Sequence, residues 1–218
     1  GSAAARAYHA HPRTEIVALC DLEQDLLNTL GDELGVEARY TDLDAMITRH
    51  QPDIVAIPTG TEFHYPLALR VLEYGVHIDI EKPLCVDCAQ ADEVLAKAQE
   101  KNAQIAVHHQ GRTGVWMKAV ARAFAEGRIG ELQHIHGHGK NYYGGYNLMN
   151  IGTHMINNML KLAGSCRSVV ASATTNGRPI VPSDVVPSPQ GMGTIVGEHI
   201  TATLDLNGGV SATLLQHR

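Results

Sequence analysis

The sequence predicts a two-part protein: a doubly wound parallel α/β sheet, followed by an α+β part with an open, mostly antiparallel sheet. In the first two-thirds, short continuous apolar runs alternate with helical patterns, which is typical of strands buried on both faces. After about Gly111, segments alternate apolar and polar residues, which is typical of a sheet with one wetter face. With 218 residues, 44% of them apolar, the chain has room for one large domain or two modest ones.

The first part is expected to span residues 1–111. Apolar periodicity and stop signals such as Gly35 and Gly75 set the helix limits, and Asp42 is a plausible helix cap. The expected helices cover residues 3–12, 25–35, 42–50, 62–75 and 88–102, and the expected strands cover 15–21, 53–59, 77–83 and 104–110.

The second part is expected to span residues 112–218. A long amphipathic helix over 113–130, closed by Gly130, opens it, and we expect Trp116 in its core. The strands are predicted at 131–140, 166–175, 199–209 and 210–218, with a Gly/Tyr-rich loop and a helix between the first two. Residues 177–193 form a Pro/Ser/Gly loop, interpreted as a lid or an oligomer arm.

Composition excludes several classes of protein. A formal net charge of −6 argues against nucleic acid as a partner, because nucleic-acid binding relies on Lys and Arg contacts to phosphate. The apolar runs are too short to cross a membrane, and no signal-peptide pattern opens the chain. The 4 scattered cysteines do not form a disulfide framework, so we expect a reducing, cytoplasmic location.

Asp21 ends the first predicted strand, where an acid can hold both hydroxyls of an adenosine ribose. Leu22 follows it, and no nearby Arg is available for a 2′-phosphate, which favours NAD over NADP. The equal alternative is that Asp21 only caps the next helix. The fingerprint G-x-G-x-x-G is not seen; Gly1 is either its last glycine or an unrelated terminal residue.

The run VHIDI ends abruptly in Glu81, Lys82 and Pro83. A lysine in a cleft at the carboxyl end of a strand is partly desolvated and can exchange protons near neutrality. We expect Glu81 to orient the lysine and Pro83 to fix the turn. The alternative is a surface Glu–Lys pair before a helix.

These residues resemble the Gfo/Idh/MocA family of glucose–fructose oxidoreductase and inositol dehydrogenase relatives. The matching stretches are HPRTEIVALCD, QPDIVAIPTGTEFHYPLALRVLEYGVHIDIEKPL, AEGRIGEL and GGYNLMNIGTHMINNMLKLAG. The resemblance implies a Rossmann-type domain, a substrate domain on an open sheet, NAD or NADP as cofactor, sugar-like substrates and a homo-oligomer, a dimer or tetramer. It also implies that the first strand and the last strands are missing.

The family pattern assigns Lys82, His154 and Asn150 to catalysis. His154 would take the hydroxyl proton, and the four-residue spacing puts Asn150 on the same helical face. The family commonly has Asp at positions 150 and 157, where this chain has Asn150 and Asn157. Without those carboxylates His154 should be a weaker base. The alternative for His154 is a core histidine.

Several further positions are expected near the cofactor or the substrate. Pro58, Thr59 and His64, in the I-P-T-x-x-x-H segment, are expected to line the cofactor with Glu81 and Lys82. Tyr142 and Tyr146 are expected at the substrate, because aromatic faces with hydroxyl tips suit a sugar ring, although such a loop is as often ordinary packing. Asn150, His109 and Arg112 are further candidates for substrate contact.

No metal site is expected. His134, His136 and His138 share one strand face, which we interpret as chance rather than as a Zn²⁺ site. Cys85 and Cys88 have redox spacing but are interpreted as part of a helix start.

The predicted activity is an NAD-dependent oxidoreduction of a secondary alcohol in a sugar, cyclitol or glycoside. Two alternatives remain at this stage. One is a glycoside cleavage or elimination through transient oxidation, and the other is a non-catalytic family member or fragment that only binds a ligand or partner.

Overall fold

The computed structural model describes residues 1–218, which divide into two compact units. The first unit contains residues 1–59, 63–81 and 88–106, and the second contains residues 60–62, 82–87 and 107–218. No helix has the length and apolar character that a bilayer span requires.

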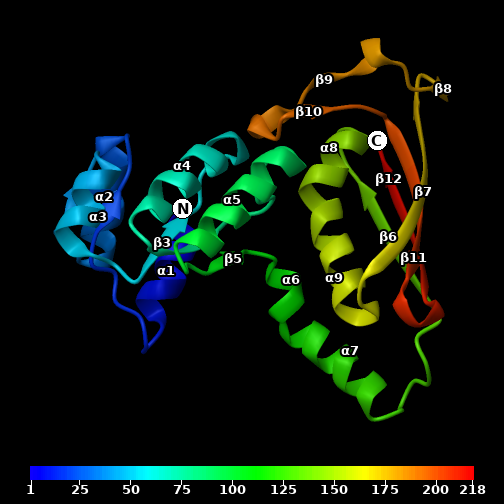
Figure 1. The fold of residues 1–218 in the computed structure, drawn as a ribbon, viewed down its shortest axis with the longest axis horizontal. Helices are drawn as coiled ribbons and strands as arrows, with labels where there is room; N and C mark the ends of the chain where they lie inside the picture. Colours follow the sequence, from blue (N-terminus) through cyan, green and yellow to red (C-terminus); the bar gives the residue numbers. More distant parts are fainter. The chain divides into compact units, whose positions relative to one another are not determined.

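The first unit holds two small sheets with helices beside them (Figure 1). The strands are β1 (Leu19–Cys20), β2 (Arg39–Tyr40), β3 (Ile54–Ile57), β4 (His77–Ile80) and β5 (Ile105–Val107). The helices are α1 (Ser2–Ala10), α2 (Gln24–Leu34), α3 (Leu43–His50), α4 (Thr61–Glu73) and α5 (Cys88–Glu100). β1 pairs with β2 in parallel, β3 pairs with β4 in parallel, and the second sheet has the order β3-β4-β5. The predicted α/β part is confirmed.

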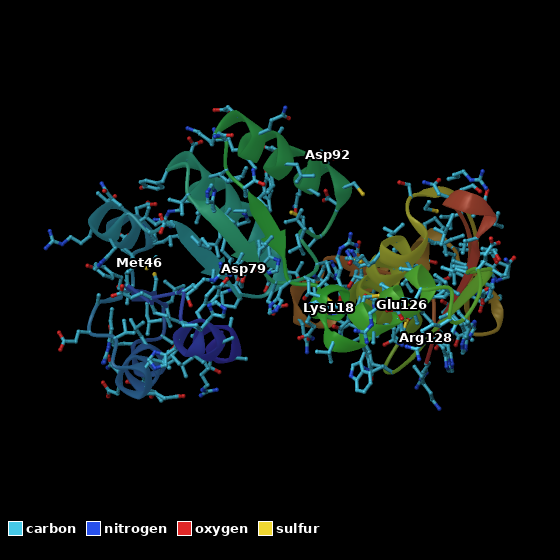
Figure 2. All side chains as sticks on the ribbon, turned by 90° about the horizontal axis from the view of Figure 1, so that it is seen from below. Met46, Asp79, Asp92, Lys118, Glu126 and Arg128 are labelled. Carbon is cyan, nitrogen blue, oxygen red and sulfur yellow. The ribbon has the colours of Figure 1, made fainter.

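Local signals place the helix ends of this unit. The Asp42 carboxylate accepts hydrogen bonds from the backbone N–H groups of Asp44 and Ala45 and so caps α3, as predicted. Gly35 ends α2 with a φ of 67°, a left-handed conformation that glycine adopts without a steric penalty. In Figure 2, Met46 marks α3 and Asp79 marks β4. Met46 is only 7% exposed and belongs to the buried core.

The second unit is built on one five-stranded sheet with the order β6-β12-β11-β7-β8. Its strands are β6 (His134–Lys140), β7 (Cys166–Thr175), β8 (Arg178–Pro179), β11 (His199–Leu206) and β12 (Ser211–His217), and a separate pair contains β9 (Val186–Pro187) and β10 (Thr194–Ile195). Its helices are α6 (Gln110–Thr113), α7 (Val115–Ala125), α8 (Gly144–Asn147), α9 (Thr153–Ala163), the π-helical turn η1 (Leu148–Gly152) and the 3₁₀ turns η2 (Pro182–Asp184), η3 (Pro189–Gly191) and η4 (Asn207–Gly209). β7, β8, β11 and β12 pair antiparallel, whereas β6 joins β12 in parallel. The predicted mostly antiparallel sheet is confirmed.

One face of this sheet carries the core of the second unit. Met159 of α9 packs against Leu204 and Leu206 of β11 and Leu214 of β12, each at most 5% exposed. Figure 1 shows α8 and α9 over that face. The alternation of buried and non-buried residues along β11 and β12 is the period-2 pattern expected of such strands.

Three predictions about the elements were wrong in detail. The helix expected over 113–130 begins only at Val115, after the extended backbone of Gly114. It ends at Ala125, two residues before Gly127 adopts a left-handed φ of 66°. Trp116 is 83% exposed and does not belong to the core. Of the strand expected over 15–21, only β1 pairs with a neighbour. Figure 2 marks Lys118 in α7 and, just beyond the helix, Glu126 and Arg128.

Candidate active site

Lys82 lies two residues beyond the end of β4, with Glu81 between them. The Glu81 N–H donates to the Ile57 carbonyl at 3.1 Å, which continues the parallel pairing of β3 and β4 by one residue. The Lys82–Pro83 peptide bond is cis, and Pro83 is buried. The turn predicted at this position is therefore present, immediately beyond the carboxyl end of a parallel strand.

Lys82 and Asn150 are in direct contact. The Nζ atom of Lys82 donates to the side-chain Oδ1 of Asn150 at 2.5 Å and to its backbone oxygen at 3.2 Å. The two residues are 68 positions apart in sequence and both are half-buried. The structure thus brings together two of the three residues that the sequence assigned to catalysis.

The π-helical turn η1 presents Asn150 to the lysine. In a π turn the backbone bonds run from i to i+5, and such turns occur often at functional sites. The Asn150 carbonyl accepts both from Lys82 and from the Oγ1 of Thr153, the latter at 3.0 Å. Both oxygens of one residue therefore face the same amine, an arrangement that the helical spacing of the sequence did not predict.

Tyr146 extends the contact from Asn150. The Nδ2 of Asn150 donates to the Tyr146 hydroxyl at 3.1 Å, and that hydroxyl donates to Oε1 of Gln190 at 3.0 Å. Tyr146 is 7% exposed, whereas Tyr142 is 66% exposed and meets the Tyr146 ring edge-on. A cavity of about 300 Å³ lies beside them. Its lining includes Asn141, Tyr142, Tyr146 and Pro189.

Gly145 lets the tyrosine-bearing loop approach the chain before β11. Its N–H donates to the carbonyl of Gly197 at 2.9 Å. A Cβ atom at this position would lie 2.7 Å from the Val196 oxygen, a distance that side chains do not tolerate. The paired glycines in YYGGY are therefore required by the fold, and they hold Tyr146 beside Asn150.

His154 lies in the first turn of α9, and its ring packs edge-on against His109 with 5.3 Å between centroids. Arg112 donates to the Oδ1 of Asn157 at 3.2 Å. These pairs bring together residues from the segment after β5 and from α9, all in the second unit. The roles of His109, His154 and Arg112 remain predictions.

The candidate cofactor residues other than Lys82 belong to the first unit. Asp21 is exposed directly after β1, and its Oδ1 accepts from the Glu23 N–H at 2.9 Å. Thr59 is exposed after β3, and its carbonyl lies 3.1 Å from the Nε2 of His64. His64 is fully buried, so its ring supports the loop that carries Thr59.

Comparison with known proteins identifies the family. The family model described as "Oxidoreductase family, NAD-binding Rossmann fold" (Gfo/Idh/MocA) matches residues 1–109, half of the chain. The chain belongs to the Gfo/Idh/MocA family. The resemblance inferred from the E-K-P and I-P-T-x-x-x-H motifs is confirmed.

Individual relatives of this Gfo/Idh/MocA chain are distant. It is 34% identical over 116 residues to D-apiose dehydrogenase of Paraburkholderia graminis, covering 53% of this chain and 31% of that relative. It is 27% identical over 164 residues to D-glucoside 3-dehydrogenase of Escherichia coli, covering 69% of this chain and 47% of that relative. The chain therefore spans less than half of the length of these curated relatives.

Solved structures share the fold. An oxidoreductase from Agrobacterium radiobacter in complex with NAD+, L-tartaric acid and magnesium superposes with a TM-score of 0.79 at 19% identity, over 97% of this chain and 61% of that one. The WlbA dehydrogenase from Bordetella pertussis, in complex with NADH and UDP-GlcNAcA, gives a TM-score of 0.77 at 18% identity, over 100% of this chain and 65% of that one.

The first unit of this family member has groups that fit a dinucleotide. α1 begins at Ser2 without a side-chain cap, so its first N–H groups are available to an anion. A Cβ atom on Gly1 would lie 3.3 Å from the Pro58 ring, a tight approach between the helix start and the loop after β3. Asp21 offers an exposed carboxylate for ribose hydroxyls.

Gln190 is the residue at this site that the sequence did not predict. It lies in the Pro/Ser/Gly loop between β9 and β10 and contacts Tyr146 from there. No local pattern marks a single glutamine in such a loop as functional. Only the preceding interpretation of the loop as a lid pointed toward a role near the site.

The histidines and cysteines that the sequence analysis set aside have the following surroundings. The Nε2 atoms of His138 and His217 are 2.6 Å apart, and the His136 ring lies beside His138 at 6.4 Å between centroids. Cys85 and Cys88 are both free thiols. Burial, together with the nearby Asp87 carboxylate, raises the pKa of Cys85 to about 11, which keeps it a neutral thiol.

Proposed function

We propose that this protein is an NAD-dependent oxidoreductase that transfers a hydride between the nicotinamide and a secondary alcohol of a sugar, cyclitol or glycoside. The observation that carries the proposal is the Lys82 amine held by both oxygens of Asn150 in a member of an oxidoreductase family. The first unit would bind the dinucleotide and the second the substrate, in a protein that we expect to be a homo-oligomer.

Proton transfer is the task of this chain's own residues. Bound NAD supplies the acceptor for the hydrogen that leaves the alcohol carbon with its electron pair. The hydroxyl proton would reach His154 by way of Lys82, whose neutral amine accepts it from the alcohol oxygen and passes it on. An amide beside the amine adds no negative charge, so the neutral amine is less disfavoured than it would be beside a carboxylate.

The dinucleotide would be held by groups of the first unit. Asp21 would accept hydrogen bonds from the ribose hydroxyls, and the start of α1 would contact phosphate. Leu22 follows Asp21 and offers no positive charge to a 2′-phosphate, which supports NAD rather than NADP. Thr59 and Glu81 would lie along the cofactor at the ends of β3 and β4.

The substrate would lie against Asn150, Tyr146 and Tyr142. An exposed tyrosine face matches the C–H face of a sugar ring, and the hydroxyl matches its polar edge. The cavity beside these tyrosines, at about 300 Å³, is at the small end of the range for ligand sites. Arg112 and His109 are further candidates for contact with substrate oxygens.

Turnover assays with NAD and a panel of sugars, cyclitols and glycosides test the proposal. We expect NADH to form with at least one substrate, and expect Lys82→Met and His154→Ala to abolish it while the far-UV circular dichroism and the melting temperature stay unchanged. Lys118→Met, which removes an exposed lysine from α7, is the matched control. Near-normal turnover by both active-site variants would exclude the proposed roles.

A transient oxidation that allows a glycosidic bond to break is the second candidate. The neutral amide of Asn150 favours this second reaction. In such a cycle NADH returns its hydride before the product leaves, so no net oxidation occurs and a strong base is not required. Glycoside cleavage without net NADH would support this reaction. Binding of NAD without either product would instead indicate a non-catalytic family member.

A further inference from the structure

Four polar side chains from three segments form one hydrogen-bonded chain in the second unit. Lys82 Nζ donates to Asn150 Oδ1, Asn150 Nδ2 donates to the Tyr146 oxygen, and the Tyr146 hydroxyl donates to Gln190 Oε1. The distances are 2.5, 3.1 and 3.0 Å. The chain starts at the proposed proton-transferring amine and ends in the loop between β9 and β10.

The direction of every bond follows from the first one. An ammonium group only donates, so the Asn150 oxygen must face Lys82 and the Asn150 nitrogen must face Tyr146. That nitrogen also only donates, so the Tyr146 oxygen accepts and its proton turns toward Gln190. Bonds aligned in this way polarise one another, and the cation at one end strengthens them.

The asparagine at position 150 is necessary for this direction. A carboxylate has no N–H to give to Tyr146, so an aspartate would take the tyrosine's own proton. The Tyr146 hydroxyl would then point inward, and Oε1 of Gln190 would lose its donor. Asparagine, unlike the aspartate that is usual in the family, therefore connects Lys82 through Tyr146 to the loop that carries Gln190.

Gln190 is an exposed residue at the outer end of the chain of hydrogen bonds. It adopts a φ of 63°, in the left-handed region that non-glycine residues rarely occupy. Two residues of its neighbourhood, Met192 and Ile195, are buried against Tyr146 itself, at 6% and 5% exposure. The Gln190 side chain and the apolar contacts therefore fasten this loop to the same tyrosine.

We propose that Gln190 is a positioning residue for Lys82, acting through Tyr146 and Asn150. When the loop is docked, Gln190 accepts the Tyr146 proton and so fixes the orientation of that hydroxyl. The hydroxyl oxygen then fixes the Asn150 amide, and the amide oxygen orients the Lys82 amine toward the substrate hydroxyl. The effect on turnover rests on the proposed oxidoreductase function, whereas the effect on the amine does not require it.

A pair of substitutions separates the hydrogen bond from the bulk of the side chain. Gln190→Glu keeps an acceptor for the Tyr146 proton, whereas Gln190→Met has similar length and no such acceptor. Thr194→Ala, which trims an exposed side chain of the same loop region, is the control. The complete protein is assayed for kcat and KM with NAD and its best substrate, and the Lys82 side chain is titrated by NMR.

We expect Gln190→Met and Tyr146→Phe to lower kcat by about two- to tenfold each, the range of one hydrogen bond, with a smaller change in KM. Both should also shift the NMR titration of Lys82 toward lower pH, because the amide no longer holds its oxygen steadily against the ammonium. Gln190→Glu should lose less kcat than Gln190→Met, because it keeps an acceptor for the Tyr146 proton, and Thr194→Ala should retain the parent's kcat and titration.

The outcomes distinguish the two proposals. A Lys82 titration that is the same in the parent, Gln190→Met and Tyr146→Phe would overturn the positioning role, even if the enzyme is active. Equal losses for Gln190→Glu and Gln190→Met, with a lowered melting temperature, would indicate a merely structural side chain and also overturn it. A shifted titration in a protein without turnover would uphold the coupling and contradict only the proposed function.

Discussion

Replacing Asn150 by aspartate would place a negative charge beside the Lys82 amine. The Nζ–Oδ1 distance of 2.5 Å means that the new carboxylate would contact the ammonium directly. At 4 Å and an effective dielectric constant of 20, two unit charges attract by about 4 kcal/mol. Both residues are only half-buried, so solvent reduces this value, and we expect the pKa of Lys82 to rise by about 1–2 units.

A higher pKa keeps the amine protonated to higher pH. At a pH below that pKa the neutral fraction falls by about 10- to 100-fold, since each unit is tenfold. In a plot of kcat/KM against pH, the limb that reports loss of the lysine proton should move to higher pH by about 1–2 units. Asn176→Asp, which adds the same charge in an exposed turn, should leave the profile in place. An unchanged or acid-shifted profile for Asn150→Asp would refute the reasoning.

Three further predictions concern the cofactor, the loop packing and acid stability. Asp21→Asn keeps an acceptor for the turn after β1 but loses the charge, so NAD affinity measured by calorimetry should fall about tenfold or more without a change in melting temperature; unchanged affinity would leave Asp21 only as a cap. Gly145→Ala should destabilise the protein by about 1–3 kcal/mol in urea unfolding, whereas Gly114→Ala, whose Cβ would meet only ordinary contacts at 3.5 Å, should cost less. A hydrogen bond from the Arg178 side chain lowers the pKa of Asp184. The Arg178–Asp184 pair therefore stabilises the fold at pH values above the ordinary aspartate pKa, and this stabilisation is lost as the pH falls through the lowered pKa of Asp184. Amide exchange near Asp184 should therefore accelerate on acidification, and Asp184→Asn should abolish that pH step; an identical pH step in the variant would contradict the assignment.

The fold was largely predictable because its signals are local. The Asp42 cap and the Gly35 stop each act within one turn, and both appear in the structure as expected. The exceptions depend on information that local patterns do not contain. The apolar residues around Trp116 predict a helix packed in the core. The segment itself holds no information on whether another surface covers it, and in the structure Trp116 is exposed.

Sequence motifs named candidate residues for the site but not the hydrogen bonds between them. The E-K-P turn and the asparagine before His154 were recognised as motifs, and the contact of Lys82 with Asn150 agrees with that pairing. The widening of η1, which turns the Asn150 carbonyl toward the amine, depends on tertiary packing. Gln190 was missed because its contact with Tyr146 joins residues 44 positions apart and follows from the path of the loop.

The most direct test of the central claim is a single-turnover measurement of NADH formation by Lys82→Met, with NAD binding measured calorimetrically on the same preparation. We predict that the variant binds NAD with the parent's affinity and forms NADH at least about 100-fold more slowly, the usual contribution of a general acid–base group. NADH formation at the parent's rate, with NAD bound equally well, would contradict the assignment of Lys82 as the proton-transferring residue.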